Sequence, residues 1–270
     1  MDSAPDSASV PSTPGSNRAG AAKPSTTRSR TAKPAAAAKT TGATRKPAAR
    51  KPAARATAPR PPKPKPVETV LSIQGLVKRF GDTIAVAGID LAVEAGSFYG
   101  VVGPNGAGKT TTLSMVTGLL RPDAGKVVVH GVDVWRDPVA AKRTMGVLPD
   151  RLRLFDRLTG AQLLFYSGTL RGLSEETVRL RTADLANAFG FEDALNRLVT
   201  DYSAGMSKKI ALAAAMIHSP RILILDEPFE SVDPVSAANV TQILRSYTES
   251  GGTVVVSSHS MDLILSLIHI

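Results

Sequence analysis

The spacing of hydrophobic and polar positions predicts alternating strands and helices from residue 67 onward. Residues 69–76 alternate apolar and polar side chains, which is the two-residue period of a half-buried strand. A Gly81-Asp82 turn follows, and residues 84–93 predict a strand pair around Gly88. Further short apolar runs predict strands at residues 98–102, 126–131, 145–148, 222–225 and 253–257.

Segments with helical spacing separate these strands. They predict helices at residues 111–120, 138–144, 207–218 and 239–247, and helical structure between residues 158 and 189. The run at 222–225 is apolar at every position, which is typical of a central parallel strand covered on both faces. Strands and helices that alternate in this way predict an α/β fold built on a mainly parallel sheet.

A glycine-rich stretch joins the strand at 98–102 to the helix at 111–120. It fits the pattern G-x-x-x-x-G-K-[ST] and consists of Gly103, Pro104, Asn105, Gly106, Ala107, Gly108, Lys109, Thr110 and Thr111. Glycines let main-chain N–H groups approach a phosphate chain, and the helix N-terminus adds partial positive charge. Lys109 supplies a cation for the β- and γ-phosphates, and Thr110 places a hydroxyl where bound Mg²⁺ would sit. The stretch therefore predicts a site for a triphosphate and its magnesium ion.

Two acids follow the apolar strand at 222–225. Asp226, at the carboxyl end of the strand, is predicted to hold Mg²⁺ directly or through water, across the crevice from Thr110. Glu227 is predicted to polarise a water for attack on the γ-phosphate, because phosphoryl transfer depends mainly on positioning and charge stabilisation. The pair predicts hydrolysis at the phosphate site.

Composition divides the chain near residue 66. Residues 1–66 hold no Phe, Tyr, Trp, Leu or Ile and carry 14 Lys and Arg against two Asp, so the +10 net charge of the chain resides in them. So few apolar side chains cannot offset the entropy of ordering, which predicts a disordered tail over 1–66 and an ordered domain over 67–270. The chain has no cysteine, and no apolar run approaches the roughly 18–20 residues that cross a bilayer.

The basic tail has two interpretations. Its repeated Lys-Pro-Ala units resemble the tails of linker histones and predict sequence-independent contact with nucleic acid or anionic lipid. The alternative is a solvated arm with no dedicated partner. The tail also resembles an organelle transit peptide loosely, but its basic units continue past residue 50.

Further motifs stand in a fixed order around the phosphate site. They are Phe80 upstream of the glycine loop, Tyr202-Ser203-Ala204-Gly205-Met206 before the helix at 207–218, Ser231-Val232-Asp233 after Glu227, and His259 after the strand at 253–257. With these motifs the chain resembles the ATP-binding cassette (ABC) ATPases over residues 70 to about 264. The resemblance implies a P-loop NTPase fold with a RecA-like mainly parallel sheet, an antiparallel β subdomain and a helical signature subdomain at about 152–219.

The resemblance also implies a role for each motif. Phe80 is implied to stack on adenine, its alternative being an ordinary core residue. Asp226 corresponds to the Walker B acid, Glu227 to the catalytic base, and His259 to the switch histidine that contacts the γ-phosphate and orients Glu227. Lys109 belongs with these catalytic groups. The remaining three residues, Ser203, Gly205 and Asp233, lie in this family at a head-to-tail dimer interface, where the signature motif caps the ATP of the partner cassette.

Three short segments depart from the usual family pattern. Tyr202, Ala204 and Met206 replace three residues of Leu-Ser-Gly-Gly-Gln, while the serine and the second glycine remain. Asp150 replaces the usual Gln or Glu, and its shorter carboxylate is expected to reach Mg²⁺ through water. Phe229-Glu230 replaces a small polar pair. None of these changes removes a catalytic group.

The C-terminus also departs from the family, whose members continue through another strand and helix. Residues 265–270 leave the acidic helical pattern expected after Met261-Asp262. They are a direct translation of CTG TCT CTT ATA CAC ATC, a transposon end used in sequencing libraries, which predicts a gene model that was cut short. A naturally short terminus is the alternative, and resequencing the locus decides between the two.

The motifs together predict the single-cassette ATPase subunit of an ABC transporter, exporter-like, that uses ATP and Mg²⁺. It is expected on the inner face of the cell membrane, in the cytoplasm, bound to a separate permease that docks on residues 158–189 with Asp150 at the hinge. One alternative is a soluble ABC ATPase tethered to nucleic acid or ribosomes by the basic tail. Another is a degenerate regulatory cassette, which is disfavoured by the presence of Lys109, Asp226, Glu227 and His259.

Overall fold

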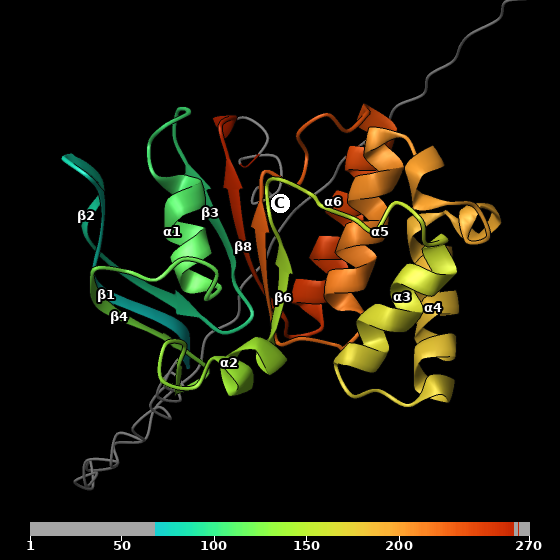
Figure 1. Cartoon of the computed structure of the whole chain (residues 1–270), viewed down its shortest axis with the longest axis horizontal. Helices are drawn as coiled ribbons and strands as arrows, with labels where there is room; N and C mark the ends of the chain where they lie inside the picture. Colours follow the sequence, from blue (N-terminus) through green and yellow to red (C-terminus); the bar gives the residue numbers. More distant parts are fainter. Residues whose placement is uncertain (1–67, 262–263, 265–270) are drawn as a thin grey trace, which may run out of the picture. The chain divides into compact units, whose positions relative to one another are not determined.

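The computed structural model describes residues 68–261 and 264 of the chain. The strands of this part form two four-stranded sheets, one parallel and one antiparallel. In Figure 1 the parallel sheet stands in the middle, with helix α1 and the antiparallel sheet on one side and helices α3 to α6 on the other. The predictions made for the tail at 1–66 and the terminus at 265–270 lie outside the described residues.

The parallel sheet has the strand order β3-β8-β7-β6. Its strands are β3 (Phe98–Val102), β8 (Thr253–Ser258), β7 (Ile222–Asp226) and β6 (Met145–Leu148). Every residue of β7 is buried, because helices or the second sheet cover both faces of this central strand. All four strands point the same way, so their carboxyl ends share one edge of the sheet.

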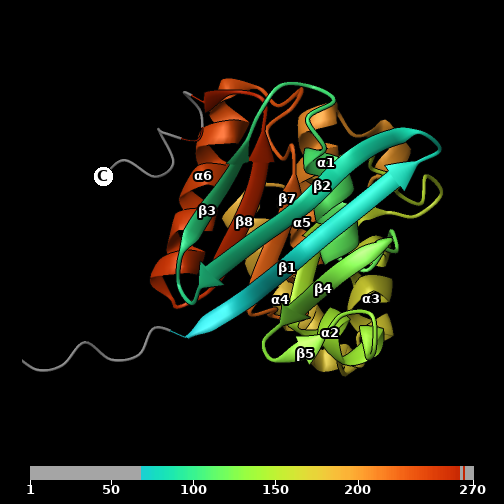
Figure 2. The same cartoon turned by 90° about the vertical axis from the view of Figure 1, so that its left-hand side faces the viewer.

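The antiparallel sheet has the order β2-β1-β4-β5 and faces the viewer in Figure 2. Its strands are β1 (Thr69–Phe80), β2 (Thr83–Glu94), β4 (Ala124–Val129) and β5 (Val132–Asp133). The strand pair predicted around Gly88 is a single strand, β2. Leu76 pairs with Ile89 and Val77 with Ala87, so Gly88, with φ at +90°, forms a bulge inside the strand. A bulge bends a strand without ending it, which is why the glycine did not divide the segment.

Six α-helices in the described part of the chain connect or cover these strands. They are α1 (Lys109–Val116), α2 (Pro138–Thr144), α3 (Gly160–Leu170), α4 (Glu175–Phe189), α5 (Ala204–Met216) and α6 (Pro234–Glu249), with 3₁₀ turns at Glu192–Ala194 and Val199–Asp201. Side chains of Thr159, Ser174, Ser203 and Asp233 cap the N-termini of α3 to α6. Within residues 68–261, none of the helices is long and apolar enough to cross a membrane.

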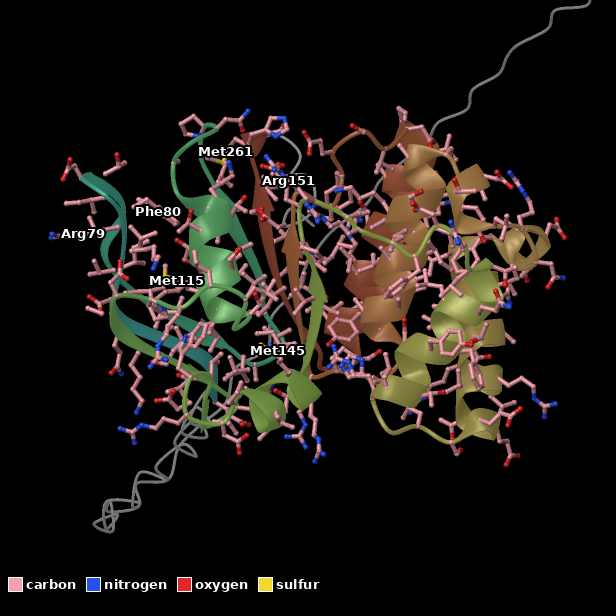
Figure 3. All side chains as sticks on the ribbon, in the orientation of Figure 1. Arg79, Phe80, Met115, Met145, Arg151 and Met261 are labelled. Atoms are coloured by element: carbon pink, nitrogen blue, oxygen red, sulfur yellow. The ribbon has the colours of Figure 1, made fainter. Side chains whose placement is uncertain are left out.

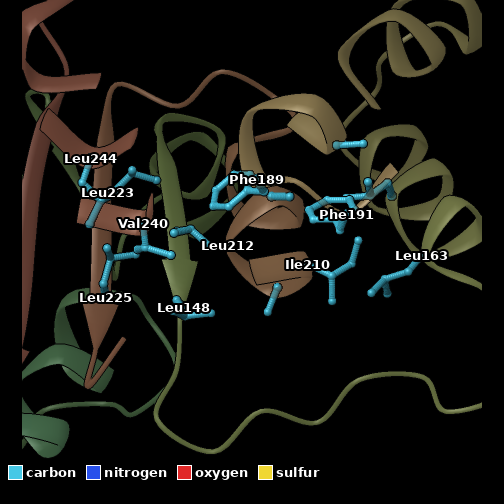
Figure 4. Packing of buried hydrophobic residues seen from close by; sticks show 14 of the residues in the cluster. Leu148, Leu163, Phe189, Phe191, Ile210, Leu212, Leu223, Leu225, Val240 and Leu244 are labelled. Carbon is cyan, nitrogen blue, oxygen red and sulfur yellow. The ribbon is translucent and has the colours of Figure 1, made fainter. Parts of the chain in front are cut away.

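Two hydrophobic clusters meet at β7. Ile222 and Ile224 point to the face covered by α1 and the antiparallel sheet, while Leu223 and Leu225 point to the face covered by the helices. Figure 4 shows the second cluster, in which the two leucines pack among side chains of α4, α5 and α6 such as Phe189. Burial from both sides fixes the position of the strand end that carries Asp226. The predicted α/β class is confirmed, whereas the bounds at about 152–219 for a helical subdomain stay a prediction.

Candidate functional site

The glycine loop between β3 and α1 forms an open anion cradle. Gly108 has φ at +87°, and a Cβ atom placed on it would lie 2.5 Å from the Ala85 carbonyl oxygen, so only glycine fits there. Among the described residues no side chain caps the N-terminus of α1, in contrast to α3 to α6. The backbone N–H groups of the first turn of α1 are thus left for a ligand with negative charge.

Lys109 lies buried at the start of α1. Its Nζ atom donates to the carbonyl oxygens of Gly103 at 2.8 Å and Pro104 at 3.3 Å, both in the glycine loop. The same nitrogen lies 3.4 Å from Oε1 of Glu227. The structure therefore brings together the lysine and the acid that the sequence placed more than a hundred residues apart.

The carboxylate of Glu227 is held on both oxygens. Lys109 faces Oε1, and Nδ1 of His259 lies 3.0 Å from Oε2. Glu227 is 9% exposed and His259 is more open to solvent. A carboxylate in this arrangement can accept a proton, and the histidine beside it can fix its orientation.

Asp226, Thr110 and Asp150 form the second part of the site. Burial raises the pKa of Asp226 above its usual range, and hydrogen bonds from Ser257 and Thr110 oppose that rise. The charges of Asp150 and Glu227 raise the pKa further. A buried carboxylate, a hydroxyl and a second carboxylate are oxygen donors of the kind that Mg²⁺ prefers, so these residues fit the expected ion.

The donor set suits Mg²⁺ that is shared with a phosphate ligand better than it suits a metal ion held by protein side chains alone. No group of three or more His, Cys, Asp and Glu side chains in the described part of the chain is arranged to hold a metal ion. Mg²⁺ is usually bound by one or two carboxylates together with substrate phosphates and water. The site therefore provides for an ion that arrives with a phosphate ligand.

A pocket of about 310 Å³ unites most of the predicted residues. It is lined by Ala85, Asn105, Gly106, Ala107, Gly108, Lys109, Thr110, Thr111, Asp150, Glu227, Glu230 and His259. A neighbouring cavity of about 190 Å³ reaches Asp226 from the side of Thr110 and Asp150. The glycine loop, Glu227 and the histidine thus meet around one pocket at the carboxyl edge of the parallel sheet, and Asp226 lines the cavity beside it.

Phe80 lies outside this pocket lining. It ends β1, is 52% exposed, and has Lys78 Nζ 5.6 Å from the centre of its ring. Figure 3 shows it beside Arg79 on the antiparallel sheet. The alternative of an ordinary core phenylalanine is wrong, because half of the side chain is exposed to solvent.

Ser203, Gly205 and Asp233 form a separate group at the first turns of α5 and α6. Ser203 caps α5 by accepting from Met206 N, and Asp233 caps α6 by accepting from Ser236 N at 2.9 Å. A Cβ atom on Gly205 would lie 3.2 Å from the carboxylate of Asp233, so the two helix starts touch here. The hydrogen bond from Ser236 N lowers the pKa of the Asp233 carboxyl below its usual value. None of the three residues lines the pocket of the glycine loop.

Two residues that hold the acids were not among those predicted from the sequence. Ser257, on β8, donates to the carboxylate of Asp226 and accepts from Glu227 N at 3.0 Å. Lys208, on α5, donates from Nζ to the Glu227 carbonyl oxygen at 2.9 Å. For Ser257 the one signal in the sequence was its place at the end of a strand of valines. For Lys208 the sequence held no signal.

Comparison with protein families and curated proteins agrees with this geometry. The family described as ABC transporter matches residues 86–230. The daunorubicin/doxorubicin resistance ATP-binding protein DrrA of Streptomyces peucetius is 41% identical over 192 residues, which cover 71% of this chain and 58% of that protein. The ABC transporter ATP-binding protein NatA of Bacillus subtilis is 38% identical over 203 residues, covering 73% and 82%. The chain thus spans less than two thirds of the length of DrrA and most of NatA.

Solved structures show the same fold. The ATP-binding subunit of an ABC transporter superposes with a TM-score of 0.67 and 26% identity, covering 72% of this chain and 81% of that one. A dimeric ATP-binding cassette in a post-hydrolysis state, bound to ADP and Pi, gives a TM-score of 0.66 at 22% identity over 72% and 90%. The resemblance drawn from the sequence motifs is confirmed: the chain belongs to the ABC transporter family, as one of its ATP-binding cassettes.

Proposed function

We propose that this chain is the ATP-hydrolysing subunit of an ABC transporter and powers a separate membrane permease. The observation that carries the proposal is the 310 Å³ pocket in which the glycine loop faces Asp150, Glu227 and His259. A phosphate cradle and a carboxylate with an adjacent histidine suit hydrolysis of a phosphoanhydride, where positioning and charge stabilisation do most of the catalysis.

The glycine loop and Lys109 bind and orient the triphosphate in this proposal. Lys109 Nζ leaves the carbonyl oxygens of Gly103 and Pro104 to reach the phosphates. Its departure also releases Oε1 of Glu227, to which it lies 3.4 Å away. Phe80 offers an exposed ring face on which adenine can stack.

Thr110 and Asp226, with Asp150 through water, are the residues that would hold Mg²⁺. When bound, the ion neutralises charge that develops on the phosphoryl oxygens. Burial penalises the charged form of Asp226 and so raises its pKa, and a cation beside the carboxylate would offset that penalty. Ser257 keeps that carboxylate oriented by donating its hydroxyl hydrogen to it.

Glu227 acts as the general base in this proposal. With Lys109 withdrawn to the phosphates, Oε1 is free to accept a hydrogen bond from the attacking water. His259 Nδ1, 3.0 Å from Oε2, holds the carboxylate in the required orientation. The low exposure of Glu227 limits the access of bulk water to the reacting centre.

The active form is proposed to be a head-to-tail dimer of two cassettes. Ser203 and Gly205 begin α5 away from the pocket of their own chain, so a partner copy is needed for them to meet a phosphate. Helix starts suit that role, because their N–H groups carry partial positive charge. Asp233, in contact with Gly205, belongs to the same face.

The permease is proposed to dock on a groove beside α3. The groove has a volume of about 330 Å³ and runs along residues 147–155 and helices α3 and α5. Exposed aromatic side chains at Phe155, Phe165 and Tyr166 lie on the same segments. Since DrrA is named for daunorubicin/doxorubicin resistance, we propose that the transporter is an exporter. Docking on a permease would place this chain in the cytoplasm, on the inner face of the membrane.

The proposal is tested by Glu227→Gln. Loss of the base should lower ATP turnover, measured as phosphate release, by about a hundredfold or more, while the affinity for Mg·ATP changes by no more than about threefold. Glu249→Gln, an exposed change at the far end of α6, serves as the control and should leave both quantities unchanged. Turnover at the control level in Glu227→Gln would remove Glu227 from its role.

A further inference from the structure

Glu227 has a backbone conformation that a glutamate seldom adopts. Its φ is +46°, in the left-handed region, where a Cβ atom crowds the main chain. The residue follows directly on β7 and carries the carboxylate that faces Lys109 and His259. An unfavourable backbone conformation at such a residue persists only where its surroundings hold it.

Three contacts from described residues hold the two peptide groups of Glu227. On the N–H side, Ser257 Oγ accepts from Glu227 N at 3.0 Å. On the carbonyl side, Lys208 Nζ donates at 2.9 Å and Glu230 N at 3.2 Å. Ser257 belongs to the neighbouring strand and Glu230 to the turn that follows, so Lys208 provides, of these three, the contact that comes from the helical side of the sheet.

The lysine binds the carbonyl oxygen of Glu227 and leaves the carboxylate to its other partners. It is half-buried on α5, just past the first turn, which Ser203 caps. A hydrogen bond from a charged donor to a carbonyl is stronger than one from a neutral donor. Its loss would leave the carbonyl oxygen of Glu227 with the bond from Glu230 N alone. The peptide group, and with it the carboxylate, would then be held less firmly.

We infer that Lys208 is a positioning residue for Glu227. Its hydrogen bond to the carbonyl oxygen fixes the left-handed backbone and thereby aims the carboxylate at the attacking water. The inference rests on the proposed function, because it assigns Lys208 a part in the same hydrolysis. It also gives α5 two tasks. Its N-cap Ser203 is proposed to meet the ATP of the partner cassette, and its Lys208 holds the base of its own chain.

Substitution of Lys208 should separate the rate from substrate binding. Lys208→Met, which keeps the length of the side chain but removes the donor, should lower kcat for ATP about tenfold and leave KM within about twofold. Lys208→Arg, which keeps a charged donor, should recover most of the rate. Lys126→Met, at an exposed position on β4, carries the same change away from the site and should behave as the wild type.

A double-mutant cycle with Glu227→Gln distinguishes positioning from a general effect on folding. If Lys208 acts through Glu227, Lys208→Met should slow single turnover about tenfold in the wild-type background and by less than about twofold in the Glu227→Gln background. Equal losses in both backgrounds, or a loss that Lys208→Arg does not relieve, would overturn the inference. Full turnover in Glu227→Gln alone would instead overturn the proposed function, so the two failures are distinguishable.

Discussion

Gly108 shows how one residue fixes the geometry of the phosphate cradle. It precedes α1 with φ at +87°, and the Ala85 carbonyl oxygen occupies the space that any side chain would need. Gly106, two residues earlier, has a similar φ of +83° but open space around it. A side chain at Gly106 would meet only the cost of a left-handed backbone, whereas one at Gly108 would also clash with Ala85.

Alanine at these two positions should therefore have different effects. Gly106→Ala incurs only the left-handed backbone, about 1–2 kcal/mol. Gly108→Ala adds the overlap with Ala85 and should lower the free energy of unfolding by a further 1–3 kcal/mol, approximately, and displace the start of α1. Urea unfolding with and without Mg·ATP measures both effects. Equal losses of stability in the two variants would contradict the role given to the Ala85 contact.

The acids and the glycine loop were predictable from the sequence because each lies in a short segment of characteristic residues. Asp226 and Glu227 follow four aliphatic residues, and Lys109 follows three glycines at fixed spacing. Ser257 and Lys208 were not predictable, because they act on those acids from other elements. Their contacts exist only once β8 and α5 have packed beside β7, and no local pattern encodes that packing.

At the scale of elements, His218 connects the end of α5 to strand β6. Its Nε2 atom lies 3.0 Å from the Met145 carbonyl oxygen, which requires the hydrogen to be on that nitrogen. A helix C-terminus normally favours a positive charge. In this protein burial, together with the positive charges of Arg171 and Arg181, lowers the pKa of His218 to about 4. The imidazole is therefore neutral where α5 meets the sheet.

Stability should consequently fall as the pH falls through the window between the two pKa values of His218. The unfolded chain, with a pKa near 6.5, binds a proton that the folded protein refuses until about pH 4. Between about pH 7.5 and about pH 5 the wild type should lose about 1–2 kcal/mol more than His218→Gln, after allowance for solvent screening. Chemical unfolding at the two pH values provides the measurement. Parallel losses would show that His218 is not the group responsible.

The bounds of the elements were predicted less well than their order. The apolar period of α5 begins at Ile210, so the sequence placed its start near 207, whereas the helix begins at Ala204 behind a Ser203 cap. The signature-motif residues 204–206 continue no periodic pattern, although they lie in the first turn of the helix. In β2 the sequence suggested a break at Gly88, whereas the bulge keeps one continuous strand.

At the scale of the whole domain, the site depends on both hydrophobic clusters. The cluster around α1 positions the glycine loop, and the cluster around α5 and α6 positions Lys208, Ser203 and Asp233. Strand β7 belongs to both clusters and ends in Asp226, followed by Glu227. A movement of the helices relative to the sheet would therefore change the position of Glu227, the proposed catalytic base. The face that carries Ser203 is also the face on which a second cassette is proposed to bind.

That dimer can be tested without weakening the helix. Aspartate caps a helix as well as serine does, so Ser203→Asp should keep α5 stable while it places a negative charge against the phosphates of the partner. In the Glu227→Gln background with Mg·ATP, light scattering should show dimers, and Ser203→Asp should raise their dissociation constant at least tenfold, approximately. Ser174→Asp makes the same exchange at the cap of α4 and should leave the dimer intact. Dimers of undiminished affinity in Ser203→Asp would exclude the start of α5 from the interface.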